Sequence, residues 1–324
     1  MFKHILSLTL ALMLILAGSA LAETVRVAVV QPLTHTSLNQ IRDTIVSELE
    51  ASDIDFEIVT RNAEGDSAAL STILENVKND GVDILVPIAT STAQSAKMVF
   101  DGTDVSVVFA AVSDPVAAGL TGDDCGFITG VSNNIPAAEI VNLISDFQPD
   151  YKLIGFLYTS SETNSVSTIN AAKAYCDANG IAYEEVSIAN LSELQTAVET
   201  LISKGVDALY TGNDNYIASA MSTYIDVAYE YGIPVYCGAD SMVADGGFAT
   251  IGVDYVQLGG QVADIVERIA KGEQPEDIPY ETLADYARFV NLQAADRVGM
   301  EISDDILANY NVLVEADGTS HFGE

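Results

Sequence analysis

Short apolar runs alternate with amphipathic stretches along the first third of the chain. Residues 24–30 and 82–88 are near-continuous runs of β-branched and other apolar residues, which is typical of parallel strands buried on both faces. Residues 38–49 place apolar side chains at helical spacing between such runs. We expect strands at 24–30, 55–60, 82–88 and 105–112, and helices at 38–49, 67–80 and 90–100. This β-α-β order predicts a doubly wound parallel sheet with right-handed crossovers.

The same rhythm restarts in the middle of the chain. We expect strands at 152–158, 182–188, 206–211 and 233–237, and helices at 166–179, 191–204 and 217–231. Residues 128–136 are interpreted as the first crossing between the two halves, because Gly130 and Pro136 interrupt both periodicities. Two copies of one pattern predict an α/β protein with two Rossmann-like, doubly wound parallel-sheet lobes and a hinge between them.

The last quarter of the chain has no apolar core of its own. It contains a strand-like run at 248–253, a helix at 256–271 and a last strand-like run at 287–292. We therefore expect it to return to the first lobe and then to the second. This assigns 23–131 plus 253–280 to lobe 1, 132–252 plus 281–295 to lobe 2, and 296–324 to a C-terminal extension.

The first 22 residues have the order of a secretory signal peptide. Lys3 precedes an apolar run at 5–16, and Ala20-Leu21-Ala22 provides a small-x-small cleavage site. The apolar run is short for a permanent membrane anchor, which needs about 20 residues; an uncleaved anchor is the alternative. We expect export by a cleavable signal peptide and a periplasmic or other extracytoplasmic location.

The charge balance narrows the class of partner. The chain has 13 Lys+Arg against 47 Asp+Glu, a net charge of −34, which disfavours binding to nucleic acid or anionic lipid. The 49% of hydrophobic residues still predicts a folded protein. Cys125, Cys176 and Cys237 form no C-x-x-C pair, and only His35 and His321 remain after signal removal, so no metal or other cofactor is expected. One disulfide plus a free thiol stays open.

The candidate ligand-binding residues lie in the strand-to-helix turns, since ligands of open α/β sheets bind beyond the carboxyl ends of the strands. These turns are rich in Ser, Thr, Asn and Asp, which are also common helix N-caps. The candidates are His35, Ser37, Thr90, Ser91, Thr92, Asp114, Tyr158, Asn164, Ser165, Asp214, Asn215 and Asp240. Residues 90–92 are expected to bind a carboxylate, and Asp214 and Asp240 an ammonium group, which suits a zwitterion such as an amino acid.

Signatures of common enzyme classes are missing from the sequence. It contains no G-x-S-x-G elbow, no P-loop and no G-x-G-x-x-G after the first strand. His35 has no recognisable nucleophile partner, so we expect a binding protein and not an enzyme.

Several of these turns resemble one known family. The most specific segments are 88–94 (IATSTAQ), 108–119 (VFAAVSDPVAAG), 129–132 (TGVS), 164–166 (NSV), Asp214-Asn215 and 252–259 (GVDYVQLG). Together they resemble the ABC-transporter substrate-binding proteins related to the tryptophan-binding TrpX type, with a type I periplasmic-binding fold. The resemblance implies binding of amino acids, in some members aromatic ones, and delivery to a permease with a cytoplasmic ATPase. One departure is Thr34-His35-Thr36, where many relatives carry Glu-His-Pro.

The leading hypothesis is therefore a monomeric, extracytoplasmic solute-binding protein of an ABC importer. Closure of the two lobes about the hinge would bury the small-molecule ligand. A ligand-sensing subunit for a membrane receptor is an alternative with the same sequence features. A hydrolase on the same scaffold is a third hypothesis, in which His35 would be needed for turnover.

Overall fold

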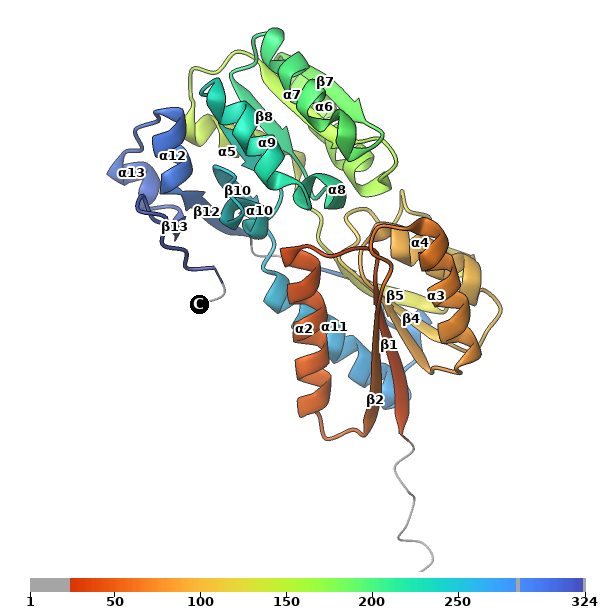
Figure 1. Ribbon diagram of the computed structural model, residues 1–324. Helices are drawn as coiled ribbons and strands as arrows, with labels where there is room; N and C mark the ends of the chain where they lie inside the picture. Colours follow the sequence, from red (N-terminus) through yellow and green to blue (C-terminus); the bar gives the residue numbers. More distant parts are fainter. Residues whose placement is uncertain (1–23, 284–285, 323–324) are drawn as a thin grey trace, which may run out of the picture.

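The chain forms two α/β lobes joined end to end, in a computed structural model that describes residues 24–322 except 284 and 285 (Figure 1). Each lobe is built on its own sheet. The first sheet has the strand order β11-β5-β4-β3-β1-β2, and the second has the order β13-β12-β10-β9-β8-β6-β7. All pairings are parallel except that of β10 with β12. The predicted fold class is confirmed.

The first lobe carries helices on both faces of its sheet. Its strands are β1 (Val25–Gln31), β2 (Phe56–Asn62), β3 (Ile84–Pro87), β4 (Ser106–Ala110), β5 (Ile128–Ser132) and β11 (Glu281–Thr282), and its helices are α2 (Thr36–Ala51), α3 (Ser67–Asn79), α4 (Thr90–Phe100) and α11 (Tyr255–Ala270). Successive side chains of a strand face opposite sides of the sheet. Val27 and Val29 of β1 accordingly join the core under α2 and α11, whereas Ala28 and Val30 join the core under α3 and α4.

The second lobe repeats this plan with helices that, apart from α6, are mostly shorter. Its strands are β6 (Ile154–Thr159), β7 (Tyr183–Ile188), β8 (Ala208–Thr211), β9 (Val235–Cys237), β10 (Ala249–Gly252), β12 (Ala287–Asn291) and β13 (Asn311–Val314). Its helices are α5 (Ala137–Phe147), α6 (Thr163–Asn179), α7 (Leu194–Ser203), α8 (Asn215–Ala218), α9 (Met221–Glu230), α10 (Asp240–Ala244), α12 (Leu292–Val298) and α13 (Asp304–Leu307). Short 3₁₀ turns occur at 123–125, 191–193 and 275–277.

The chain changes lobe three times. It leaves the first sheet after β5, returns between β10 and α11, and leaves again between β11 and β12. We expected 128–136 to be the first crossing, but 128–132 is a strand of the first sheet. Gly130 interrupts the apolar pattern because a Cβ there would lie 2.1 Å from the carbonyl oxygen of Phe109. The glycine is thus a requirement of close strand packing and does not mark a linker.

The C-terminal residues also pair with the two sheets more extensively than the sequence suggests. We expected 296–324 to be an extension, but β13 pairs with β12, and Leu313 and Val314 are buried. We placed 281–295 in the second lobe, yet the two residues of β11 pair with β5 of the first sheet. The helix expected at 217–231 is interrupted between α8 and α9.

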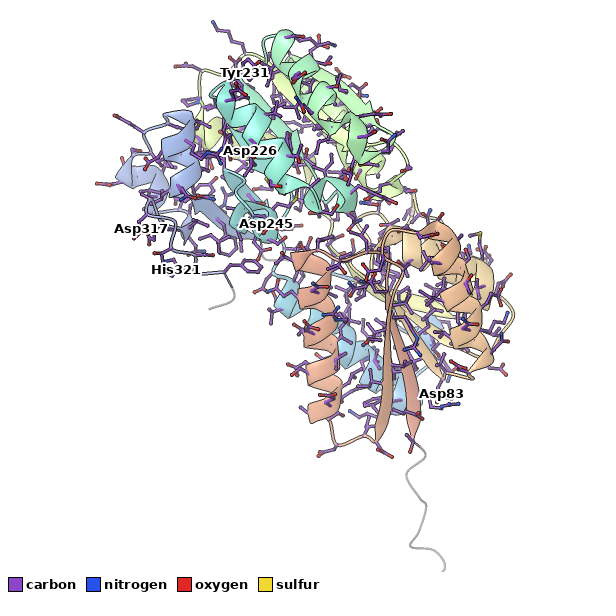
Figure 2. The ribbon with its side chains drawn as sticks, in the orientation of Figure 1. Asp83, Asp226, Tyr231, Asp245, Asp317 and His321 are labelled. Carbon is purple, nitrogen blue, oxygen red and sulfur yellow. The ribbon has the colours of Figure 1, made fainter. Side chains whose placement is uncertain are left out.

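Acidic side chains are spread over both lobes. Figure 2 places Asp83 at the end of the first lobe that is remote from the second, and Asp226 and Asp245 on the second lobe. Cys125, Cys176 and Cys237 are buried and unpaired. Among the described residues, no helix has the length and apolar character needed to cross a membrane. The signal peptide expected at 1–22 lies outside the described residues.

Candidate functional site

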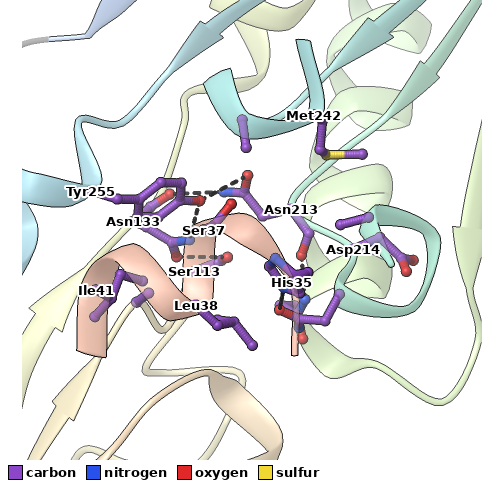
Figure 3. A pocket seen from close by; sticks show the side chains of 15 residues that line it. His35, Ser37, Leu38, Ile41, Ser113, Asn133, Asn213, Asp214, Met242 and Tyr255 are labelled. Carbon is purple, nitrogen blue, oxygen red and sulfur yellow. Dashed lines mark hydrogen bonds between the residues drawn. The ribbon is translucent and has the colours of Figure 1, made fainter. Parts of the chain in front are cut away.

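A small cavity lies where the carboxyl ends of the strands of both sheets meet (Figure 3). Its volume is about 20 Å³, which is room for roughly one water molecule. Its walls come from both lobes. The lining residues are His35, Ser37, Leu38, Ile41, Ala111, Ser113, Asn133, Asn164, Asn213, Asp214, Asn215, Ala218, Ala239, Met242 and Tyr255. Five of the predicted candidates are among them, namely His35, Ser37, Asn164, Asp214 and Asn215.

The start of α2 supplies the first-lobe wall. His35 is the N-cap residue and has extended backbone angles, but its side chain makes no capping hydrogen bond. The imidazole instead reaches the second lobe, where Nε2 lies 3.1 Å from Oδ1 of Asn215. Burial lowers the pKa of His35 to about 4, so the ring is neutral near pH 7. Ser37, two residues further along the chain, pairs its hydroxyl with that of Ser241 at α10.

Asn133, Asn213 and Tyr255 form a hydrogen-bonded triangle beside α2 (Figure 3). Asn133 Nδ2 donates to the Tyr255 hydroxyl at 3.3 Å, and that hydroxyl donates to Asn213 Oδ1 at 3.4 Å. Asn213 Nδ2 donates back to the carbonyl of Asn133 at 3.3 Å. Asn133 and Tyr255 flank two of the three lobe crossings, so the triangle ties the hinge to the cavity.

The sequence analysis did not select these three residues. All three lie in or next to segments that the family resemblance had already marked. Asn133 directly follows the segment 129–132, Asn213 precedes Asp214-Asn215, and Tyr255 lies in 252–259. Gly238 is a further sequence feature that could have indicated Asn213, because a Cβ at position 238 would lie 2.6 Å from the backbone nitrogen of Asn213. The turn that carries Asn213 therefore packs directly on the turn after β9.

Asp214 lines the cavity, but its carboxylate is engaged elsewhere. Its oxygens accept hydrogen bonds from the Thr159 backbone at 2.6 Å, the Thr159 hydroxyl at 2.9 Å and the Ile217 backbone at 2.9 Å. Figure 3 shows the carboxylate directed away from the Asn133–Tyr255 group and into the α8 turn. The structure thus makes Asp214 an N-cap that joins β6 to α8, in contrast to the ammonium partner that we expected.

A buried carboxylate that we did not predict lies beside Asp214. Glu162 accepts hydrogen bonds from the Asn164 amide at 2.9 Å, the Asn215 amide at 2.8 Å, and the backbone N–H groups of Asn215 and Tyr216, each at 3.1 Å. Burial, and secondarily the charge of Asp214, raises the pKa of Glu162 to about 7. A glutamate inside a Ser- and Thr-rich turn gives no local signal of such burial.

Asp240 remains the carboxylate with the fewest protein partners near the cavity. It is buried at the start of α10, next to the lining residue Ala239. Its Oδ1 accepts from the backbone N–H of Ser241 at 2.7 Å. Burial raises its pKa to about 6. A nearby cation would restore the charged form of this carboxylate.

The other predicted residues lie away from the cavity. Thr90 and Thr92 are buried at the start of α4, and their hydroxyls have no hydrogen-bond partner among the described residues. Ser91 instead lines a separate groove of about 330 Å³ between the lobes. Tyr158 donates its hydroxyl to Glu185 of β7 at 3.2 Å. None of residues 90–92 lines the cavity, so the carboxylate site expected there has no support from the cavity.

Two predicted ligand-binding residues remain. One lies at the contact between the lobes, and the other lies next to a residue that lines the cavity. Asp114 accepts from the Ser167 hydroxyl of α6 at 2.6 Å, and from the backbone N–H of Ala117 at 2.9 Å. Ser165 is buried one residue after Asn164. Across residues 24–283 and 286–322, no cluster of three or more His, Cys, Asp or Glu side chains is arranged to hold a metal ion.

Comparison with known proteins agrees with this two-lobed site. A tyrosine-binding protein of Clostridioides difficile is 28% identical over 85% of this chain and 81% of its own length. An ABC domain from Streptococcus pneumonia, solved in complex with L-Trp, is 31% identical with a TM-score of 0.84 over 90% of this chain and 99% of that chain. A ligand-free, open substrate-binding protein with adhesive properties from Clostridium difficile is 30% identical with a TM-score of 0.68 over 89% and 99%.

The family described as ABC transporter substrate binding protein matches residues 26–313, nearly the whole described chain. The chain belongs to the ABC transporter substrate-binding protein family.

Proposed function

We propose that this protein binds an amino acid, with an aromatic side chain preferred, in the cavity between its lobes and delivers it to an ABC permease with a cytoplasmic ATPase. The observation that carries the proposal is a cavity whose polar lining comes from both lobes, at the carboxyl ends of both sheets. The similar proteins named for tyrosine and solved with L-Trp support the ligand class.

Neutral donors suit the carboxylate end of such a ligand. None of the residues lining the cavity is a lysine or an arginine. Ser37, Asn213 and Tyr255 offer hydroxyl and amide groups, and the N-terminus of α2 adds a favourable dipole for an anion. Burial raises the pKa of the Tyr255 hydroxyl, which therefore stays protonated; its hydrogen, donated to Asn213 in this structure, would turn to the ligand carboxylate.

Asp240 suits the ammonium end. Its raised pKa reflects a buried carboxylate with few partners, and an ammonium group would supply the missing countercharge. Leu38, Ile41 and Met242 provide apolar contacts for a side chain, and a methionine sulfur packs favourably against aromatic rings.

The lobes must separate before such a ligand can enter, because the cavity is far smaller than an amino acid. Hydrogen bonds such as those from Ser167 to Asp114 and from Thr36 to Asp245 (3.4 Å) hold the lobes together in this structure. The higher TM-score against the L-Trp complex than against the open, ligand-free protein, at almost equal identity, supports a closed arrangement. Opening and closing about the three crossings is the proposed transport cycle.

Members of this family are extracytoplasmic, and we propose that residues 1–22 direct export as a cleavable signal peptide. We further propose that the protein acts as a monomer. It would release its ligand chemically unchanged, so mass spectrometry of the ligand after long incubation should detect no product. Conversion of the ligand that depends on His35 would instead favour a hydrolase.

Isothermal titration calorimetry against the twenty L-amino acids tests the ligand. L-Trp or L-Tyr should bind most tightly, and Asp240→Asn should weaken binding by roughly 10- to 100-fold, as expected for loss of a charge-assisted hydrogen bond. Asp226→Asn is a matched control, since Asp226 is an exposed carboxylate of the same lobe. Failure of every amino acid to bind would overturn the ligand class while leaving the family membership intact.

A further inference from the structure

A short line of hydrogen bonds crosses the cleft and ends on His35. It starts at Glu162 in the second lobe, passes through the side-chain amide of Asn215, and reaches the imidazole in the first lobe. The two links measure 2.8 Å from Asn215 Nδ2 to Glu162 Oε2 and 3.1 Å from His35 Nε2 to Asn215 Oδ1. Asn215 thus contacts a carboxylate on one side and a neutral ring on the other.

The carboxylate decides which way the Asn215 amide points. The backbone N–H groups of Asn215 and Tyr216 can only donate, and both are directed at Glu162. Glu162 is therefore an acceptor in this network, so the NH₂ group of Asn215 faces it. The reversed amide would place an oxygen against the carboxylate. Oδ1 of Asn215 consequently faces His35 and needs a donor there.

This orientation fixes the proton of the imidazole. A neutral histidine has one N–H, and Nε2 must carry it in order to donate to Asn215. Nδ1 then keeps a lone pair. Since Nε2 is used by Asn215, Nδ1 is the ring nitrogen that His35 can offer to the cavity that it lines.

We propose that Glu162 is a positioning residue that acts through Asn215 to hold His35 as the Nε2–H tautomer, so that Nδ1 accepts a hydrogen bond from an N–H or O–H group of the ligand. The inference rests on the proposed function, because it assumes that the ligand occupies this cavity. It adds a selection rule to that function. A ligand must present a donor, such as an ammonium, indole N–H or phenol O–H group, to the first-lobe side.

Nitrogen-15 NMR of the imidazole tests the positioning role without any ligand. The chain has three histidines, and loss of a signal in His35→Asn assigns His35. In the wild type at pH 8.5, where Glu162 is charged and His35 is neutral, the Nδ1 and Nε2 shifts should be those of a single Nε2–H tautomer. In Glu162→Gln and in Asn215→Ala, both shifts should move toward the average of the two tautomers.

Glu193→Gln is the matched control, because Glu193 also accepts a backbone N–H (Ala189, 2.8 Å) but belongs to a remote turn. It should leave the His35 shifts unchanged. An Nδ1–H tautomer in the wild type would overturn the proposal. Unchanged His35 shifts in Glu162→Gln, with altered shifts in Asn215→Ala, would mean that Asn215 sets the tautomer without Glu162. If Glu162→Gln does not fold, Asn215→Ala still tests the proposal, because it removes the link between Glu162 and His35.

Ligand affinity distinguishes a His35 that accepts a hydrogen bond from the ligand through Nδ1 from a His35 that only joins the lobes. Asn at position 35 places its amide near the former Nδ1, whereas Gln reaches toward the former Nε2. His35→Asn should therefore retain binding of L-Trp and L-Tyr better than His35→Gln, by about tenfold. The opposite order would mean that His35 serves only to join the lobes. If neither amino acid binds the wild type, the proposed ligand fails, and the tautomer measurement still decides the positioning role.

Discussion

Burial moves the pKa values of His35 and Glu162 in opposite directions, although both side chains hydrogen-bond to Asn215. The histidine falls to about 4 from its ordinary 6.5, and the glutamate rises to about 7 from 4.5. In both cases burial disfavours the charged form. The two residues therefore contribute to stability with opposite dependence on pH, and their effects offset each other in the wild type.

The pH dependence of stability should reveal this pair once one member is removed. His35 stabilises the fold above pH 6.5, and this contribution is lost as the pH falls toward 4. Glu162 stabilises the fold below pH 4.5, and that contribution is lost as the pH rises through 7. Relative to wild type, Glu162→Gln should lose stability on acidification from pH 6.5 to 4.5, whereas His35→Gln should gain it. Each change should be about 2 kcal/mol over these two pH units, because each group differs between the folded and unfolded states by most of one proton, at 1.36 kcal/mol per unit.

Denaturant unfolding followed by circular dichroism between pH 4.5 and 7.5 measures this difference. Asp240 and Asp245, whose pKa values are also raised by burial, titrate in all three proteins and cancel in the comparison. Stability curves that stay parallel to that of the wild type would contradict the assignment of these two pKa shifts.

At the scale of elements, the contact between α2 and α11 positions much of the site. Both helices begin at the cavity, α2 after His35 and α11 at Tyr255. They approach closely because Gly259 faces α2. A Cβ at Gly259 would lie 2.8 Å from the Cβ of Thr44 and 3.2 Å from the carbonyl oxygen of Ile41. The neighbouring Gly260 has no atom within 4 Å of the corresponding position.

Alanine at these two adjacent glycines should have opposite effects on stability. Gly259→Ala forces the two helices apart and should lower the free energy of unfolding by about 1–3 kcal/mol. Gly260→Ala meets no obstacle and should raise it by up to about 1 kcal/mol, because alanine favours a helix. Thermal and denaturant unfolding measure both. Equal effects of the two substitutions would mean that the helix contact does not depend on Gly259.

Elements with an apolar run or helical spacing were predictable, including short strands such as β3, β8 and β9, whereas elements without such a pattern were not. Apolar runs and helical spacing located β1 to β4, and the bounds of α4 agree with the prediction. By contrast, β11 has two residues, and its pairing with β5 depends on a partner about 150 positions away. Among the site residues, His35 was predictable as a polar side chain in a turn. The burial of Glu162 was not, because it results from backbone donors that only the folded lobe assembles.

At the scale of the whole molecule, the two lobes carry charges of the same sign. The chain has 34 more acidic than basic residues, and the excess is shared between the lobes. Closing the cleft brings these acidic lobes together, while the crossings keep them joined. Repulsion should therefore favour the open arrangement when salt is low. Hydrogen bonds such as that from Ser167 to Asp114 act against it in the closed arrangement.

Ligand affinity should accordingly rise with ionic strength. The Debye length is about 30 Å in 0.01 M salt but only about 3 Å in 1 M salt, so repulsion between lobes is screened over this range. If closing costs of the order of 1 kcal/mol more in low salt, the Kd for L-Trp or L-Tyr should fall about fivefold from 0.01 to 0.5 M NaCl. Small-angle scattering of the ligand-free protein should show a smaller radius of gyration over the same series. Sucrose at matched osmolality is the control and should not reproduce a purely electrostatic effect. A Kd that is constant or rises with salt would mean that closure is governed by the local contacts at the cavity and not by the charge of the lobes.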